Sequence, residues 1–447
     1  MTATLSRLSV SARLCAGIVL LGLASLARAT LPIEAWTLPN GARVLFVENR
    51  ALPMIDVSVD LPAGYARDTA ETSGRAAMAL SMMRLGAGGM PETRIAAGLA
   101  DVGAQMSKRF DADRAGYALR TLSAPSERER ALELLATVLQ SPDFPGEVLE
   151  REKARVMANL KEAAMKPESL AERAFSAAIY PDHPYALRGV GEIGSVAALT
   201  REDLRIHYTR WFRSDWAVVA IMGDVSREEA DGIARRLTGS LPRADGPVEP
   251  LPIAGAVTAA VERFIEHPAS QSHILVGQPA MARNDPDYFP LFVGNYVLGG
   301  GGFSSRLVDE IRQKRGLAYS SYSAFMPSAA GGVFQIGLQT RKDQAAQALE
   351  VVRSTLRAYV ESGPSEQELA AAKLNLVGGF PLRIDSNKKI HDYLGLMGFY
   401  GLPLDYLDRF VENIEAVTRD QIRDAFRRRI DPDRLVTVVV GAVAPGR

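Results

Sequence analysis

Two kinds of hydrophobic pattern alternate along this chain. Short stretches of alternating or continuous apolar residues predict strands, and longer stretches with apolar residues every three or four positions predict helices. The predicted strands of the first half lie in Trp36–Glu48, Ile55–Leu61, Gln105–Phe110, Gly116–Leu122 and Trp216–Met222. The predicted helices of that half lie in Thr72–Leu85, Glu92–Val102, Glu127–Leu139, Gly146–Ala164, Leu170–Ile179, Arg201–Trp211 and Arg227–Leu237. The first strand stretch is divided by Asn-Gly, a strong hairpin signal.

The end of the chain repeats a pattern from its middle. Leu199–Val225 aligns without gaps to Val417–Val443, and Gly223 falls opposite Gly441. Each stretch predicts a helix followed by a buried strand. Because this repeat is far longer than the period of a solenoid, it predicts two homologous domains. The segment 241–255, which lies between the two predicted domains, contains four prolines. This composition is typical of a semi-rigid linker.

Composition places the chain among globular proteins, with 47% hydrophobic and 23% charged residues. Its 52 basic and 52 acidic side chains balance, so the chain has no electrostatic footprint for nucleic acid. At the N-terminus, Arg7 and Arg13 precede the apolar run Leu14–Leu26, which an A-x-A site at residues 27–29 follows. This order predicts a cleaved secretory signal peptide over residues 1–29, with a membrane-anchoring helix as the alternative.

The only cysteine, Cys15, lies inside that apolar run. Cleavage would remove it, and the mature chain would then have neither a thiol nor a disulfide. No later stretch is apolar enough to span a bilayer. We therefore expect a periplasmic protein without a membrane span after signal removal.

The stretch Leu298–Phe325 combines three elements. It opens with four consecutive glycines, which we expect to form a loop because glycine loses the most backbone freedom on ordering. A helix is predicted over Phe303–Lys314, with Ser304 or Ser305 as its N-cap. Gly316 is a natural helix stop, and residues 319–325 then alternate as a strand.

The glycine run, SSRL and EIRQKRGLAYS together resemble the second domain of the pitrilysin/insulinase-type zinc peptidases, in the branch of the mitochondrial processing peptidase. The resemblance covers nearly the whole mature chain. It implies an α+β fold of two homologous domains, residues 30–240 and 263–447, each with a mostly antiparallel sheet packed by helices. A proline-rich linker at residues 241–262 would join them.

The resemblance also assigns roles to individual residues. It implies that Arg312 and Tyr319 reach an active site, where they bind the substrate backbone and the oxyanion. A guanidinium and a phenol offer the hydrogen-bond donors that a developing oxyanion needs. The resemblance further implies a substrate-binding loop made of Gly299, Gly300, Gly301 and Gly302, although a tight turn that lets the helix enter the core explains these glycines nearly as well.

Catalytic members of this family carry H-x-x-E-H on a helix of the first domain, with two zinc-binding histidines, a general base and a distant glutamate ligand. The matching positions here are Ala77 and Ser81 for the histidines, Leu80 for the base and Asn159 for the distant glutamate. None of these four side chains suits zinc or a base. The five histidines show no helical i,i+4 pair that could substitute. We therefore expect no zinc on this chain.

These expectations favour a non-catalytic, substrate-positioning subunit of a heterodimeric zinc endopeptidase. Zinc would be held by a partner chain that carries H-x-x-E-H, peptides would be the substrates, and activity would require that partner. The alternative is a catalytically inactive peptide-binding or scaffold protein of the same fold. A peptidase with an unrecognised zinc site ranks lowest.

Overall fold

The structure, a computed structural model, describes residues 32–441 of the chain. The predicted signal peptide, residues 1–29, lies outside this range. Residues from Glu34 onward belong to one compact unit. Within the described range, no helix is both long and apolar enough to cross a membrane.

The first half of the chain forms a six-stranded sheet in the order β1-β2-β8-β3-β7-β6. Neighbouring strands are antiparallel except for the parallel pair β2 and β8. The strands are β1 Glu34–Thr37, β2 Arg43–Glu48, β3 Met54–Leu61, β6 Gln105–Phe110, β7 Ala115–Leu122 and β8 Val218–Gly223, and a separate small ribbon joins β4 Gly86–Ala87 to β5 Met90–Pro91. All five strand stretches predicted for this half are confirmed, including the hairpin.

The helices of the first half also follow the predicted pattern. They are α2 Arg75–Met83, α3 Glu92–Asp101, α4 Pro125–Gln140, α5 Gly146–Ala163, α6 Pro167–Ile179, α7 Ile193–Ala198, α8 Arg201–Trp211 and α9 Arg227–Thr238. Helix α4 contacts β7 and α9 contacts β2, so both cover the sheet. Apolar residues of these elements form one large buried cluster that includes Phe46, Tyr117 and Leu135.

The second half forms a five-stranded sheet in the order β11-β12-β10-β13-β9. Its strands are β9 Val261–Glu266, β10 Gln271–Pro279, β11 Ala318–Met326, β12 Val333–Arg341 and β13 Val436–Gly441. Its helices are α10 Tyr288–Asn295, α11 Arg306–Val308, α12 Ala345–Ser362, α13 Glu366–Gly378, α14 Asn387–Tyr400, α15 Phe410–Ala416 and α16 Arg419–Arg429. Only β13 and β9 run parallel, as β8 and β2 do in the first sheet. Both sheets are therefore mostly antiparallel, as predicted.

The internal repeat coincides with equivalent elements of the two halves. In the predicted register, helix α8 falls on α16 and strand β8 on β13, with the same bounds at both ends. Both helices begin with a capping box, made by Thr200 with Asp203 and by Thr418 with Gln421. The two-domain α+β architecture is confirmed.

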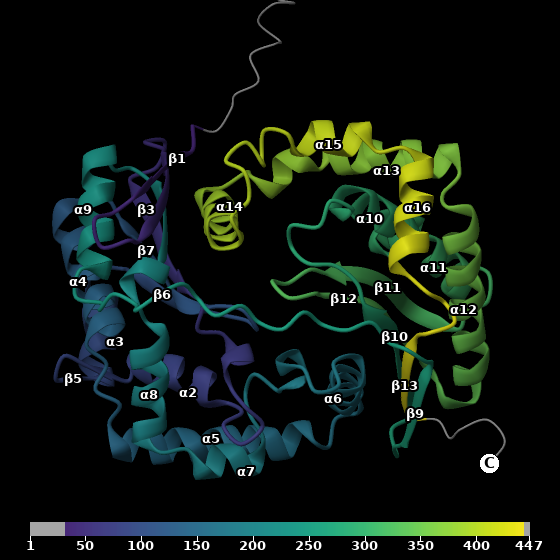
Figure 1. The fold of residues 1–447 in the computed structure, drawn as a ribbon, viewed down its shortest axis with the longest axis horizontal. Helices are drawn as coiled ribbons and strands as arrows, with labels where there is room; N and C mark the ends of the chain where they lie inside the picture. Colours follow the sequence, from purple (N-terminus) through teal and green to yellow (C-terminus); the bar gives the residue numbers. More distant parts are fainter. Residues whose placement is uncertain (1–31, 442–447) are drawn as a thin grey trace, which may run out of the picture. The chain divides into compact units, whose positions relative to one another are not determined.

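Each half lends one helix to the sheet of the other half. Helix α6 contacts β10 and β13 of the second sheet, and α14 contacts β2, β3 and β8 of the first. Figure 1 shows α14 beside β3, and α6 beside β13. In the register of the repeat, Pro167 falls on Asp385 and Ile179 on Met397, so α6 and α14 are equivalent helices. The two halves therefore exchange the same element.

Small residues let these exchanged helices lie close to the foreign sheets. On α14, a Cβ atom at Gly398 would lie 2.5 Å from Val218 Cγ1 and 2.7 Å from Leu45 Cδ1. Ala171 of α6 packs with Val438 in a buried cluster drawn from both halves. Close packing of this kind tolerates little added volume.

Gly398→Ala is expected to lower the free energy of unfolding by about 1–3 kcal/mol, because the new methyl group overpacks the contact with β2 and β8. The matched control is Gly232→Ala in α9, where nothing lies within 4 Å of the added atom. That change is expected to stabilise the protein by up to about 1 kcal/mol, because alanine is the better helix former. Urea unfolding measures both. If Gly398→Ala is as stable as the parent, α14 does not lie this close to the sheet.

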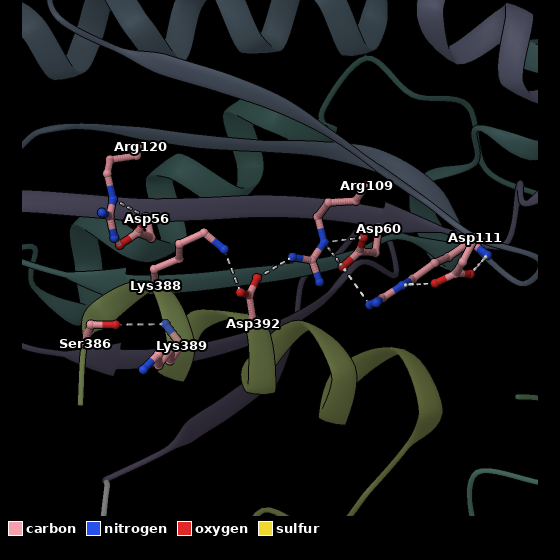
Figure 2. Close-up of polar contacts among 10 residues, drawn as sticks. Asp56, Asp60, Arg109, Asp111, Arg120, Ser386, Lys388, Lys389 and Asp392 are labelled. Atoms are coloured by element: carbon pink, nitrogen blue, oxygen red, sulfur yellow. Dashed lines mark hydrogen bonds and ion pairs between the residues drawn. The ribbon is translucent and has the colours of Figure 1, made fainter. Parts of the chain in front are cut away.

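An ion-pair network fastens α14 to the first sheet. Arg109 on β6 donates from Nε to Asp60 Oδ1 of β3 at 2.9 Å and from Nη1 to Asp392 Oδ1 of α14 at 2.9 Å. Lys388 holds the other oxygen of Asp392 at 2.9 Å. Figure 2 shows Asp392 between Arg109 and Lys388. The Asp60 side chain is wholly buried, and burial raises its pKa despite the opposing Arg109 and Arg114 guanidinium groups.

Candidate functional site

The four positions that match the zinc site of catalytic relatives converge on one cavity. Ala77, Leu80 and Ser81 of α2 and Asn159 of α5 all line a pocket of about 340 Å³. Helix α2 contacts both α5 and β6, whose Lys108 also lines the pocket. The four positions that were matched by sequence thus lie at one place in the fold.

The chemistry of this pocket does not fit a zinc ion. Ala77 and Leu80 have no donor atom, and Leu80 is buried. Ser81 Oγ accepts a hydrogen bond from Lys108 Nζ at 2.8 Å. The only hydroxyl among the four positions therefore already binds an ammonium group. Burial of the ammonium and the nearby charges of Arg84 and Arg155 lower the pKa of Lys108. A dication would meet positive charge here in place of carboxylate and imidazole ligands.

Sequence reasoning did not single out Lys108. A signal was available, because alternation along β6 places it on the same strand face as Met106 and Phe110. Phe110 also lines the pocket. A lysine between two apolar residues on one strand face indicates a specific partner for its ammonium, which here is Ser81.

The histidines have separate structural surroundings. Burial lowers the pKa of His207 to about 3 and that of His391 to about 4, so both are neutral at pH 7. His183 Nδ1 accepts from the Tyr185 amide at 3.0 Å in a tight turn. Within residues 32–441, no group of three or more His, Cys, Asp or Glu side chains is placed to hold a metal ion.

The glycine run differs in part from the predicted loop. Gly299 and Gly300 end a π-helical turn, Tyr296–Gly300, that continues α10. A Cβ atom at Gly299 would lie 2.5 Å from the amide nitrogen of Ser323, which explains the first glycine by close packing against β11. A Cβ atom at Gly301 would lie 2.7 Å from Tyr296 O, and Gly302 has φ +60°. Close packing or a left-handed backbone thus accounts for these glycines.

The helix after the glycines is shorter than predicted. Gly302–Ser304 forms a 3₁₀ turn, and the α-helical turn α11 begins only after Ser305. Ser305 is the N-cap residue, yet its hydroxyl donates back to Gly302 O at 2.7 Å and does not cap the helix. Residues 309–313 then widen into a π-helical turn, and Gly316 has φ +62°. The predicted stop is confirmed, and the predicted start is three residues early.

Arg312 and Tyr319 lie together on the surface of the second half. The Arg312 guanidinium carbon lies 4.6 Å from the centroid of the Tyr319 ring and 4.7 Å from that of Phe303. Tyr319 is 82% exposed and Phe303 is 69% exposed. This Phe303–Arg312–Tyr319 stack holds the cation between two rings, an arrangement that attracts a guanidinium.

The polar atoms of the stack are available to a ligand. Neither Arg312 nor Tyr319 makes a side-chain hydrogen bond or an ion pair with any residue of the described chain. Ring stacking does not use their N–H and O–H groups, which are therefore free to donate. The lining of the 340 Å³ pocket comes from the first half, so the structure does not bring this stack into it.

Comparisons with known proteins agree with this fold. The family model for insulinase, peptidase family M16, matches residues 43–190, and the model for the peptidase M16 inactive domain matches residues 198–376. The crystal structure of a peptidase M16 inactive domain from Pseudomonas fluorescens is similar with a TM-score of 0.89 and 35% identity, over 93% of this chain and 99% of that chain.

Two further relatives match over most of their length. An uncharacterised zinc protease of Mycobacterium tuberculosis is 28% identical, over 92% of this chain and 94% of the relative. The non-peptidase homolog YmxG of Helicobacter pylori is 25% identical, over 89% of this chain and 91% of the relative. Since the family models together span more than half of the sequence, the chain belongs to the insulinase family of peptidases, family M16, as a non-catalytic member.

Proposed function

We propose that this chain is the substrate-positioning subunit of a periplasmic zinc endopeptidase made of two different chains. The partner chain would carry H-x-x-E-H and hold the zinc ion. This chain would contribute the Phe303–Arg312–Tyr319 stack from its second half. The predicted signal peptide at residues 1–29 supports the periplasmic location.

The observation that carries this proposal is the unpaired Arg312 guanidinium. An exposed arginine usually finds a carboxylate or a carbonyl partner, and many arginines of this chain do. Arg312 instead lies between two rings with all its donors free. Such a preorganised donor can bind a peptide carbonyl without breaking an internal bond first.

The proposed roles follow from the donors. Arg312 has five N–H groups in a fixed fork, which suits the carbonyl oxygens of an extended peptide backbone. Tyr319 has one phenolic O–H, which suits the oxyanion that develops at the scissile carbonyl in the partner's active site. Neither group can attack a peptide bond or activate water, so activity requires the other chain.

The test is peptide cleavage by the purified chain mixed with an H-x-x-E-H partner from the same organism. Arg312→Ala and Tyr319→Phe are each expected to lower turnover on the order of a hundredfold, the usual loss for one oxyanion donor. Arg315→Ala is the matched control, because that nearby arginine pairs with Glu310 and faces no ring. Its turnover should match that of the parent.

Two results would contradict the proposal. If both Arg312→Ala and Tyr319→Phe keep the turnover of the parent, neither residue binds the substrate or the oxyanion as proposed. Failure of the two chains to co-elute on size exclusion, with no gain in cleavage on mixing, would remove the partnership and favour a peptide-binding or scaffold protein. The Helicobacter pylori relative described as a non-peptidase homolog supports keeping that second candidate.

A further inference from the structure

Among residues 32–441, three basic side chains and no acidic side chain line the pocket at the positions that match the zinc site of catalytic relatives. Lys108, Arg155 and Arg188 line it, and the described lining residues include no Asp or Glu. Glu152 lies nearby, but its carboxylate is held by Arg155 at 2.5 Å and by Arg151 at 3.2 Å. Glu152 therefore balances Arg155, and the charges of Lys108 and Arg188 are left for a ligand that enters.

Two of these cations keep donors for a ligand. Lys108 Nζ donates to the neutral Ser81 hydroxyl and to no carboxylate among residues 32–441. The Arg188 guanidinium has no hydrogen-bond or ion-pair partner in the described part of the chain. Asn159 likewise makes no side-chain hydrogen bond to a described residue, so its amide adds a neutral donor at the same cavity. Such groups favour an anion with several acceptor oxygens.

The rest of the pocket is apolar. Ala77, Leu80, Val156 and Leu160 contribute its hydrocarbon wall. Its volume of about 340 Å³ is within the range of small-molecule sites, which begins near 300 Å³. A lone inorganic anion would leave this wall in contact with water. The shape and lining fit a ligand that joins one carboxylate to one apolar group.

We infer that this pocket binds the free C-terminal carboxylate of a peptide whose last side chain is apolar. The carboxylate accepts from Lys108 Nζ and the Arg188 guanidinium, and the last side chain packs against Leu80 and Val156. This inference concerns the chain by itself and does not rest on the proposed partnership.

The experiment measures binding of a fluorescein-labelled tetrapeptide that ends in leucine, by fluorescence anisotropy, to the chain alone. The free acid is expected to bind about tenfold to a hundredfold more tightly than the same peptide with a C-terminal amide, the range for a charge-assisted hydrogen bond. Affinity for the acid should fall as sodium chloride is raised, whereas affinity for the amide should barely change.

Lys108→Gln and Arg188→Gln should each remove most of the preference for acid over amide. The matched control is Lys161→Gln, an exposed lysine on α5 that does not line the pocket, and it should keep the preference. Ala77→Phe fills the cavity and should weaken both peptides alike. The melting temperature of each variant shows whether it is folded.

Three outcomes would overturn the inference. Equal affinity for the acid and the amide would show that no carboxylate is recognised. An unchanged preference in folded Lys108→Gln and Arg188→Gln would place the carboxylate elsewhere. Hexanoate that competes as well as the unlabelled peptide acid would identify a free short-chain carboxylate as the ligand. Loss of cleavage with a partner, by contrast, would bear only on the proposed function.

Discussion

Replacing Arg109 with leucine is expected to lower the free energy of unfolding by about 3 kcal/mol, the lower end of the range for breaking a buried ion pair. The Asp60 side chain is wholly buried and depends on Arg109 for its 2.9 Å ion pair. Arg114 Nη1 remains 3.6 Å from Asp60 Oδ2 and keeps the loss from being larger. The variant also removes the ion pair from β6 to Asp392 of α14, which leaves Asp392 with Lys388 of its own helix.

The pH dependence of this loss has a definite sign. Without Arg109, the pKa of Asp60 in the folded state rises further above its unfolded value, because burial and the charge of Asp111 raise it and only Arg114 then opposes them. The folded variant therefore binds more protons than the unfolded chain, and its stability increases as pH falls toward the unfolded pKa near 4. The deficit relative to the parent should shrink on acidification below pH 7.

Urea unfolding at several pH values measures this prediction. Lys388→Gln is the control, because Lys388 binds the same Asp392 from an exposed position and should contribute less than about 1 kcal/mol. Asp60→Asn combined with Arg109→Leu should recover part of the loss, since no buried charge is left unpaired. If Arg109→Leu costs no more than Lys388→Gln, the network does not fasten α14.

Restoring the zinc ligands is expected to give a tight metal site only when Lys108 is also removed. The combined changes Ala77→His, Leu80→Glu, Ser81→His and Asn159→Glu rebuild the residue set of catalytic relatives on α2 and α5. In the parent chain, Lys108 donates a hydrogen bond to the Ser81 hydroxyl. In the variant this hydroxyl is absent, and the ammonium group has lost its partner. Two like unit charges about 4 Å apart repel each other by roughly 4 kcal/mol at an effective dielectric of about 20, and a lysine beside the metal would lower zinc affinity by repulsion of this order.

Lys108→Met in the restored variant should therefore raise zinc affinity by at least about a hundredfold, given the roughly 1.4 kcal/mol that corresponds to each tenfold change. Competition with a chelating dye measures it. Lys161→Met in the same background removes an equal charge from α5 outside the pocket and should change affinity little. Equal zinc affinities with and without Lys108 would show that its ammonium group lies too far from the metal to affect binding.

Local patterns predicted much of this fold. The alternating stretch 55–61 became β3 and the predicted helix 201–211 became α8, because hydrophobic periodicity is a local property. The destination of α6 and α14 could not be predicted in this way. An apolar face predicts that a helix packs against another element, but the helix sequence does not tell which sheet that element belongs to.

The candidate site shows the same division. The resemblance identified Ala77, Leu80, Ser81 and Asn159, which line one cavity, and Arg312 and Tyr319, which stack on each other. It did not identify Lys108, because its partner Ser81 lies 27 positions away on another element. Nor did it predict the π-helical turn at Gly299, which depends on the close approach of Ser323 from β11.

The exchange of α6 and α14 makes each half incomplete by itself. A half expressed alone would lack the helix that contacts its sheet, since that helix belongs to the other half. Apolar strand residues that are buried in the whole chain would then be open to solvent. The two halves are therefore expected to unfold in one cooperative step and to be poorly soluble when they are produced separately.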